Sequence, residues 1–168
     1  VGLENDMTEL EVAIGYKFES FGLLTLAMTH RSFSKDNNER LEFLGDAILG
    51  AVVSSILFDA NPDHKEDRLS LKRAELVKGQ SLATIGRSVG IPEMLRLGAG
   101  EAKQGGADRD SIIADAFEAL IGAVQLDAGM EAVEKIVRRL FMDFLEKSET
   151  ANLKDSKTEL QEQVQSEG

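Results

Sequence analysis

The sequence contains no cysteine and no tryptophan, and only two prolines and two histidines among its 168 residues. Without cysteine the chain can form neither disulfides nor thiolate metal sites, which fits a reducing compartment. No uninterrupted apolar run approaches the roughly 18 residues of a membrane span, and no signal-peptide pattern opens the chain. We therefore expect a cytoplasmic location and no membrane partner.

The charge of the chain argues against one class of ligand. The formal net charge is −11, whereas a protein that holds nucleic acid through its phosphates is usually basic. Bound cations can neutralise the carboxylates of a metal site, and a separate basic module can supply affinity. The sequence therefore predicts that this segment alone does not bind nucleic acid tightly. With 42% apolar residues, it has the profile of a soluble globular protein.

The rest of the chain is organised around a helix predicted over residues 37–58. At roughly 100° per residue, one side of this helix is an apolar core stripe made of Leu41, Leu44, Ile48, Ala51 and Val52. Glu39, Glu42 and Asp46 share the other side. Like charges stacked on a helix repel, so three acids indicate a cation site. Phe43 lies beside them and requires a partner that covers it.

A second acidic stripe follows in a helix predicted over residues 111–126. Asp115 and Glu118 are one turn apart, with Gly122 on the same stripe, and the opposite side is Ile113, Phe117, Leu120 and Val124. If the two helices pack side by side, their acids converge. Oxygen ligands without histidine or cysteine suit Mg²⁺, with Mn²⁺ as a substitute. For either helix alone, a solvated face is the simpler interpretation.

Three blocks of the sequence resemble the ribonuclease III family. These are Asn38–Ala47 (NERLEFLGDA), Ser111–Ala119 (SIIADAFEA, with Ile113 where leucine is commoner) and Thr29–Ser32 (THRS). The resemblance extends from Leu10 to Gln165. It implies an all-α, dimeric endonuclease domain that cleaves both strands of an RNA duplex. The expected products have 5′ phosphates and short 3′ overhangs.

The resemblance also implies roles for single residues. The metal site would consist of Glu42, Asp46, Asp115 and Glu118, of which Asp46 and Glu118 match the positions usually called catalytic. Glu39 and Glu66 match two further acids of the family's cleft, which act on substrate or at the subunit boundary. Phe43 matches a residue that inserts into the partner of a homodimer.

The remaining pattern predicts short helices and no strands. Helices are expected near residues 8–14, 21–27, 69–78, 82–89, 92–97 and 130–147, and no period-2 run of β-branched residues occurs. Thr8 and Glu11 have the spacing of a capping box. Residues 98–110 contain four glycines, which favours a mobile connector, with a phosphate cradle as the alternative.

Three domain segments are expected. Residues 1–147 form the nuclease domain and 148–157 a polar linker. Residues 158–168 resemble the opening of the double-stranded-RNA-binding module of bacterial ribonuclease III, and the chain ends too early to complete it. This tail argues against the minimal family type that lacks the module.

Other interpretations make distinct demands on the sequence. A non-catalytic RNA-binding or scaffold protein on the same fold would lose acids, and all six are present. A di-iron helical protein requires Glu-x-x-His, which neither His30 nor His64 completes. His30 is either a ligand or, as we favour, a hydrogen-bonded packing residue. Lys65, Arg68 and Lys72 share a stripe that either contacts phosphates or is simply solvated.

Overall fold

The all-α class expected from the sequence is confirmed for the part of the chain that the structure describes. The computed structural model describes residues 2–147, and these form helices without any strand, apart from an isolated bridge between Thr29 and Arg96. The elements are α1 (Gly2–Ile14), α2 (Phe21–Ala27), α3 (Glu39–Ala60), α4 (Glu66–Val77), α5 (Gly79–Ser88), α6 (Ile91–Met94), α7 (Ala99–Lys103), the 3-10 helix η1 (Gly106–Asp108) and α8 (Asp110–Ala128). A last helix covers residues 130–147. Residues 148–168, with the expected linker and module start, lie outside the described residues.

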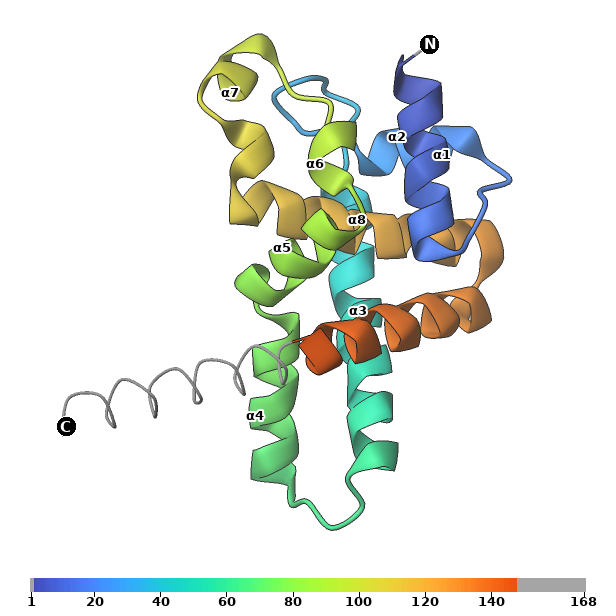
Figure 1. Ribbon diagram of the computed structural model, residues 1–168, viewed down its shortest axis with the longest axis vertical. Helices are drawn as coiled ribbons and strands as arrows, with labels where there is room; N and C mark the ends of the chain where they lie inside the picture. Colours follow the sequence, from blue (N-terminus) through green and yellow to red (C-terminus); the bar gives the residue numbers. More distant parts are fainter. Residues whose placement is uncertain (1, 148–168) are drawn as a thin grey trace, which may run out of the picture.

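Helices α3 and α8 form the centre of the molecule (Figure 1). Helix α8 is buried along most of its length, and its predicted core residues Ile113, Phe117, Leu120 and Val124 are all buried. Helices α2 and α5 also pack on α8. Helix α4 returns along the C-terminal half of α3, so the two form a hairpin at one end of the molecule. The core therefore surrounds α8, and helix α3 crosses helix α8.

Two glycines allow the backbones of α3 and α8 to touch. A Cβ atom added to Gly45 would lie 1.7 Å from the carbonyl oxygen of Glu118. A Cβ atom on Gly122 would lie 2.3 Å from the carbonyl oxygen of Leu41. No side chain fits at either position, and this close approach brings the acidic segments of both helices together. The predicted role of Gly122 is confirmed, and Gly45 makes the reciprocal contact.

One carboxylate fastens the N-terminal segment to the end of α8. Asp127 accepts a hydrogen bond from the Tyr16 hydroxyl at 2.6 Å and from the backbone N–H groups of Glu19 and Ser20 at 2.8 and 3.0 Å. Helix α1 ends at Ile14, and Gly15 follows it with a φ of +68°, as the sequence indicated. Together these contacts fix the approach of α2 to the core.

The start of the chain and residues 98–110 differ from the sequence expectation. The capping box is wrong because α1 begins at Gly2, so Thr8 lies inside the helix. The Glu11 carboxylate instead accepts the N–H of Phe18 at 2.8 Å. Residues 98–110 form α7 and η1 rather than an irregular connector. The Arg109 guanidinium pairs with the Glu101 carboxylate at 2.7 Å.

The buried side of α3 is rotated from the predicted stripe. Ala51 is exposed, whereas Gly45, Leu49 and Val53 are buried, because the glycine side faces α8. By length and composition α3 is also the one described helix that could cross a membrane. It reaches that length only if Asp46 and Asp59 are included, and 39% of the apolar stretch is buried inside the molecule.

Candidate metal centre

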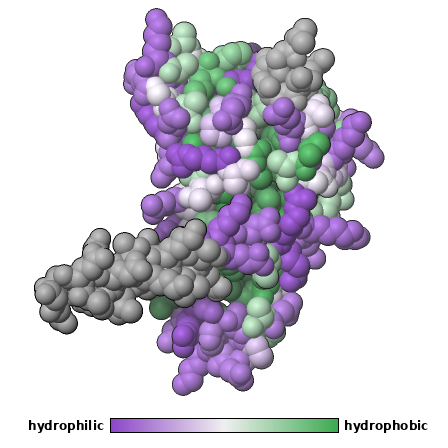
Figure 2. Space-filling model, viewed as in Figure 1, coloured by the Kyte–Doolittle hydropathy of each residue, from purple (hydrophilic) through white to green (hydrophobic). Residues whose placement is uncertain are grey.

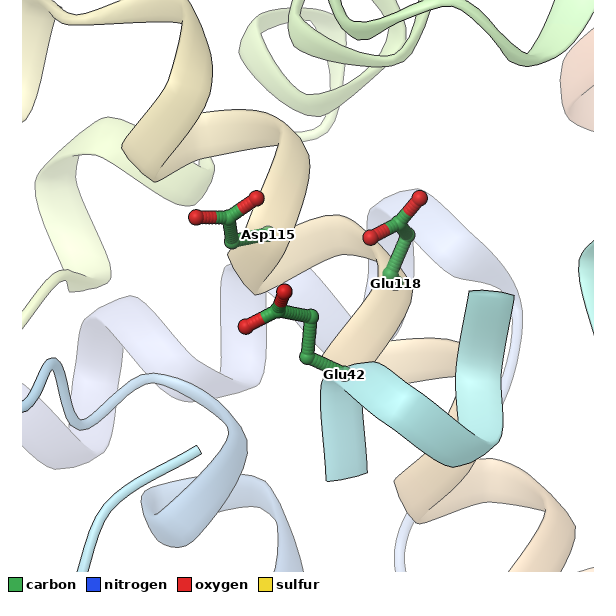
Figure 3. A group of neighbouring side chains, drawn as sticks. All are labelled: Glu42, Asp115 and Glu118. Atoms are coloured by element: carbon green, nitrogen blue, oxygen red, sulfur yellow. The ribbon is translucent and has the colours of Figure 1, made fainter. Parts of the chain in front are cut away.

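Three carboxylates converge beside the crossing of α3 and α8. Glu42 projects from α3, and Asp115 and Glu118 project from consecutive turns of α8 into the same space (Figure 3). One carboxylate oxygen from each lies within 4.8 Å of the others, and all three side chains are partly buried. The helix crossing therefore creates a cluster of oxygen donors that neither helix has alone.

The electrostatics of this cluster favour a bound cation. Burial, followed by the negative charges of Asp46, Asp115 and Glu42, raises the pKa of Glu118 to about 8. Burial and the neighbouring acids likewise raise the pKa of Glu42, and burial raises that of Asp115. Each shift reports that negative charge is unfavourable here, and a divalent cation would relieve it. Three hard oxygen donors fit Mg²⁺ or Mn²⁺.

Asp46 lies beside the cluster rather than within it. It is exposed, one turn after Glu42 on α3, and it is not among the three residues whose oxygens converge. Its charge nevertheless raises the pKa of both Glu42 and Glu118, so its carboxylate is close to both. Of the four predicted metal acids, the structure brings three together and leaves the fourth at their solvent side.

The two further acids occupy separate places. Glu39 lies on the rim of the cluster, with its carboxylate 3.6 Å from the Arg31 guanidinium. Glu66 is the first residue of α4, and its carboxylate accepts a hydrogen bond from the Ser70 hydroxyl at 2.7 Å. It lines a pocket within the hairpin of α3 and α4. Within one subunit Glu66 is therefore not part of the acid cluster.

A cleft of about 650 Å³ opens from the cluster and carries both signs of charge. We call it the site cleft. Its lining includes Glu39, Glu42 and Asp115, together with His30, Arg31, Ser32, Asn38, Glu101, Arg109, Ser111 and Ile112. Sequence reasoning did not assign Arg31 and Arg109 to the site. Arg31 belongs to the recognised block Thr29–Ser32, which was a usable signal, whereas Arg109 reaches the cleft only through the turn after η1.

Phe43 is exposed, as its position on the acidic side of α3 predicted. Its exposed fraction is 81%, the largest among the exposed large apolar side chains of residues 8–147. It borders a hollow of about 900 Å³, which we call the leucine hollow, lined by Leu23, Leu26, Leu41, Leu44 and Leu126 with polar residues of 35–40. Hydrophilic residues cover most of the face in Figure 2. An exposed aromatic beside an apolar hollow is typical of an interface.

The chain is similar to known proteins over most of its length. A family model described as Ribonuclease-III-like matches residues 21–145. A Ribonuclease 3 of Pseudomonas fluorescens is 52% identical over 96% of this chain and 71% of that protein. A Ribonuclease 3 of Pseudomonas aeruginosa is 48% identical over 99% of this chain and 73% of that protein.

Solved structures show the same arrangement of helices. The nuclease domain of ribonuclease III from Campylobacter jejuni, described with a flexible region involved in dimer formation, has a TM-score of 0.78 and 43% identity. The match covers 80% of this chain and 94% of the Campylobacter jejuni chain. Dicer from Pichia stipitis has a TM-score of 0.61 and 26% identity, and the match covers 80% of this chain and 59% of the Dicer chain.

Proposed function

The chain belongs to the ribonuclease III family and is an endoribonuclease of double-stranded RNA, and from this premise we propose how its acids cleave. Glu42, Asp115 and Glu118 hold Mg²⁺, or Mn²⁺ in its place. The observation that carries the proposal is the convergence of their oxygens within 4.8 Å. A bound cation would supply an activated water and neutralise charge on the departing 3′ oxygen.

Glu118 and Asp46 have different roles in the proposed reaction. Glu118, with a pKa of about 8, carries a proton near neutral pH and would hold a cation in its ionised form. Asp46, on the solvent side of these three acids, would be the fourth carboxylate of the metal site and would orient the attacking water. Cleavage of the bond between phosphorus and the 3′ oxygen leaves a 5′ phosphate. The retention of every recognised acid favours this activity over a non-catalytic scaffold.

We further propose a homodimer joined through Phe43. A two-fold axis places the same patch on both partners, so each Phe43 can enter the other subunit's leucine hollow. The hollow and Phe43 adjoin each other on one surface, which is what a self-complementary joint requires. Two sites in one dimer would cut both strands and leave short 3′ overhangs. Glu39 and Glu66 would face the RNA or the subunit boundary.

The proposed domain runs over residues 1–147, which include the matched range 21–145. The linker at 148–157 and the start of an RNA-binding module at 158–168 remain proposals. We place the protein in the cytoplasm, where RNA processing occurs and where a cysteine-free chain needs no oxidising environment.

Cleavage of a defined RNA duplex tests the function. Duplex RNA incubated with Mg²⁺ or Mn²⁺ should give short duplex products whose 5′ ends accept ligation directly. A chelator should stop the reaction, and a single strand of the same sequence should survive. Glu118→Gln keeps the size of the side chain and removes its charge, so it should abolish cleavage while the helical circular dichroism signal persists. Cleavage that resists the chelator, or near-normal activity of this variant, would refute the metal assignment.

A further inference from the structure

The proposed chemistry does not use His30, although this residue lies at the site. It follows α2 and is one of the residues that line the site cleft, together with Glu42 and Asp115. Its backbone is held in place, because its N–H donates to the carbonyl oxygen of Arg96 at 3.1 Å. The expected hydrogen bond is present, since Nδ1 lies 2.8 Å from the Ser32 hydroxyl. The role of the other ring nitrogen remains to be assigned.

Two hydrogen bonds determine which ring nitrogen carries the proton. The backbone N–H of Ser32 donates to Nδ1 at 3.2 Å, and a backbone N–H can only donate. The Ser32 hydroxyl oxygen accepts the N–H of Gly98 at 2.9 Å, which leaves its own proton free for Nδ1. Nδ1 therefore offers a lone pair, and the neutral imidazole carries its proton on Nε2.

The loop that imposes this tautomer is closely packed at Ser32. A Cβ atom on Gly98 would lie 2.2 Å from the carbonyl oxygen of Ser32, so the segment before α7 packs directly against the loop after α2. Within residues 2–147 no acceptor is hydrogen-bonded to Nε2. The free edge of the ring is thus a fixed donor on the wall of the cleft.

An N–H donor at Nε2 of His30 cannot bind a metal ion, but it can bind a phosphate oxygen. Nε2–H has no lone pair for a metal ion, so in this tautomer His30 is not a cation ligand. Arg31 and Arg109 line the same cleft. Guanidinium and N–H groups are donors that bind phosphate oxygens in proteins. Here two guanidinium groups and one N–H donor lie beside the proposed cation site.

We propose that Nε2–H of His30 donates a hydrogen bond to a non-bridging phosphate oxygen of the RNA strand in the site cleft. The contact holds the scissile phosphate in the cleft near Glu42 and Asp115 with equal strength before and during the reaction, and Ser32 is the positioning residue that fixes the tautomer. This inference rests on the proposed function, because it assumes that the cleft receives RNA. Backbone recognition of this kind is independent of base sequence.

Substitution of His30 in the full chain tests the contact. His30→Ala should raise the KM for duplex RNA about tenfold or more with kcat nearly unchanged, since the bond forms on binding and persists in the transition state. His30→Gln should restore part of the affinity because its amide N–H can reach a similar position. His64→Gln, a change of the other histidine outside the cleft, serves as the matched control. An unchanged KM in both His30 variants would overturn the proposal.

Sulfur substitution in the RNA identifies the accepting atom. A phosphorothioate at the scissile position replaces one non-bridging oxygen with a weaker acceptor, and the two diastereomers address the two oxygens. In the wild type one diastereomer should raise KM, whereas His30→Ala should show a smaller penalty for that same diastereomer. Equal penalties in the two proteins for both diastereomers would contradict a bond from His30.

Two measurements separate this role from a structural one. A long-range ¹H–¹⁵N spectrum should show the His30 proton on Nε2, and a proton on Nδ1 would overturn the inference. Mn²⁺ affinity, followed by electron paramagnetic resonance, should be equal in wild type and His30→Ala. A parallel loss of Mn²⁺ affinity would mean that His30 acts through the metal ligands instead. If the wild type fails to cleave, the proposed function fails, while binding of intact duplex by wild type and His30→Ala still tests the contact.

Discussion

Glu118 links the acid cluster to the stability of the fold. Its pKa rises from 4.5 to about 8 on folding, so the folded state binds its proton more tightly than the unfolded state. The stabilising contribution of that proton is complete below pH 4.5 and is lost as the pH rises through about 8. In chelator, the melting temperature should therefore fall between pH 5 and pH 8.

The comparison that isolates this effect is Glu118→Gln. Its melting temperature should depend less steeply on pH across the same range, because the titrating group has gone. Circular dichroism melts at a series of pH values measure both slopes. Identical slopes in the two proteins would show that Glu118 titrates near its ordinary range. Glu42 and Asp115 shift in the same direction, so the variant should retain part of the slope.

Cation binding should also release a proton at neutral pH. Mg²⁺ requires the ionised carboxylate, and Glu118 with a pKa of about 8 is largely protonated at pH 7 without a cation. Calorimetric titrations with Mg²⁺ in two buffers of different ionisation enthalpy should give different heats for the wild type. For Glu118→Gln the heats should converge. Buffer-independent heats in the wild type would contradict the assignment.

At the scale of elements, the crossing of α3 and α8 depends on the absence of side chains. Gly45→Ala places a Cβ atom where the Glu118 carbonyl oxygen already lies, so the helices must separate. We expect a loss of about 3 kcal/mol or more in the free energy of unfolding, with reduced metal affinity. Urea unfolding and Mn²⁺ titration measure these effects.

The same helix supplies the control. An added Cβ atom at Gly50 meets nothing within 4 Å, and alanine is favoured over glycine in a helix by about 1 kcal/mol. Gly50→Ala should therefore leave the protein equally or more stable. If Gly45→Ala is as harmless as Gly50→Ala, the close approach of the two helices is not required.

Sequence periodicity predicted the helices and most of their buried sides, because apolar spacing directly reflects which face meets the core. It could not predict that Gly45 is buried, since only the position of α8 makes a missing side chain necessary there. The sequence likewise placed Asp46 with Glu42 on one stripe. The structure separates them because Glu42 borders α8 and Asp46 faces solvent. Which residues of α3 are buried therefore depends on where α8 lies, and the sequence of α3 alone does not reveal it.

The segment 98–110 shows a second limit. Its four glycines favoured a connector, yet it forms α7 and η1. The ion pair of Arg109 with Glu101 joins residues that are close only after folding. Gly98 and Gly106 are there for close packing against Ser32 and Glu101. Glycine content alone does not distinguish a mobile loop from a tightly packed one.

At the scale of the whole molecule, Phe43 should determine the association of subunits. An aromatic anchor buried in a partner pocket contributes about 2 kcal/mol or more, which is roughly a thirtyfold change in dissociation constant. Both copies are lost in a symmetric dimer, so Phe43→Ala should shift the protein strongly toward monomer. Its helical signal should remain.

Sedimentation at matched concentrations measures this shift. Phe58→Ala is the control, because Phe58 is also exposed on α3, at 70%, but does not line the leucine hollow. If Phe43→Ala sediments as the same stable dimer as wild type, Phe43 is not the joint. Equal weakening by both variants would indicate that exposed apolar area in general, and not this anchor, holds the subunits together.

The overall charge limits how this segment binds its substrate. With a net charge of −11, it should bind duplex RNA weakly through the few cations of the site cleft, and binding should fall steeply with salt. Cleavage should require low ionic strength. Fluorescence anisotropy from low to physiological salt measures the slope. Tight binding that is insensitive to salt would show that this chain carries the affinity by itself.

The crossing of α3 and α8 also has a consequence for the timing of synthesis. The ribosome makes Glu42 early, whereas Asp115 and Glu118 emerge only after the intervening helices α4 to α7 have been translated. Because Gly45 must pack against the backbone of Glu118, a long loop has to close before the proposed ligands meet. If these acids form the metal site, as we propose, a nascent chain that has not completed α8 should be unable to cut RNA. The ribosomes and messenger that produce the enzyme would then be exposed to its activity only once translation has passed this helix.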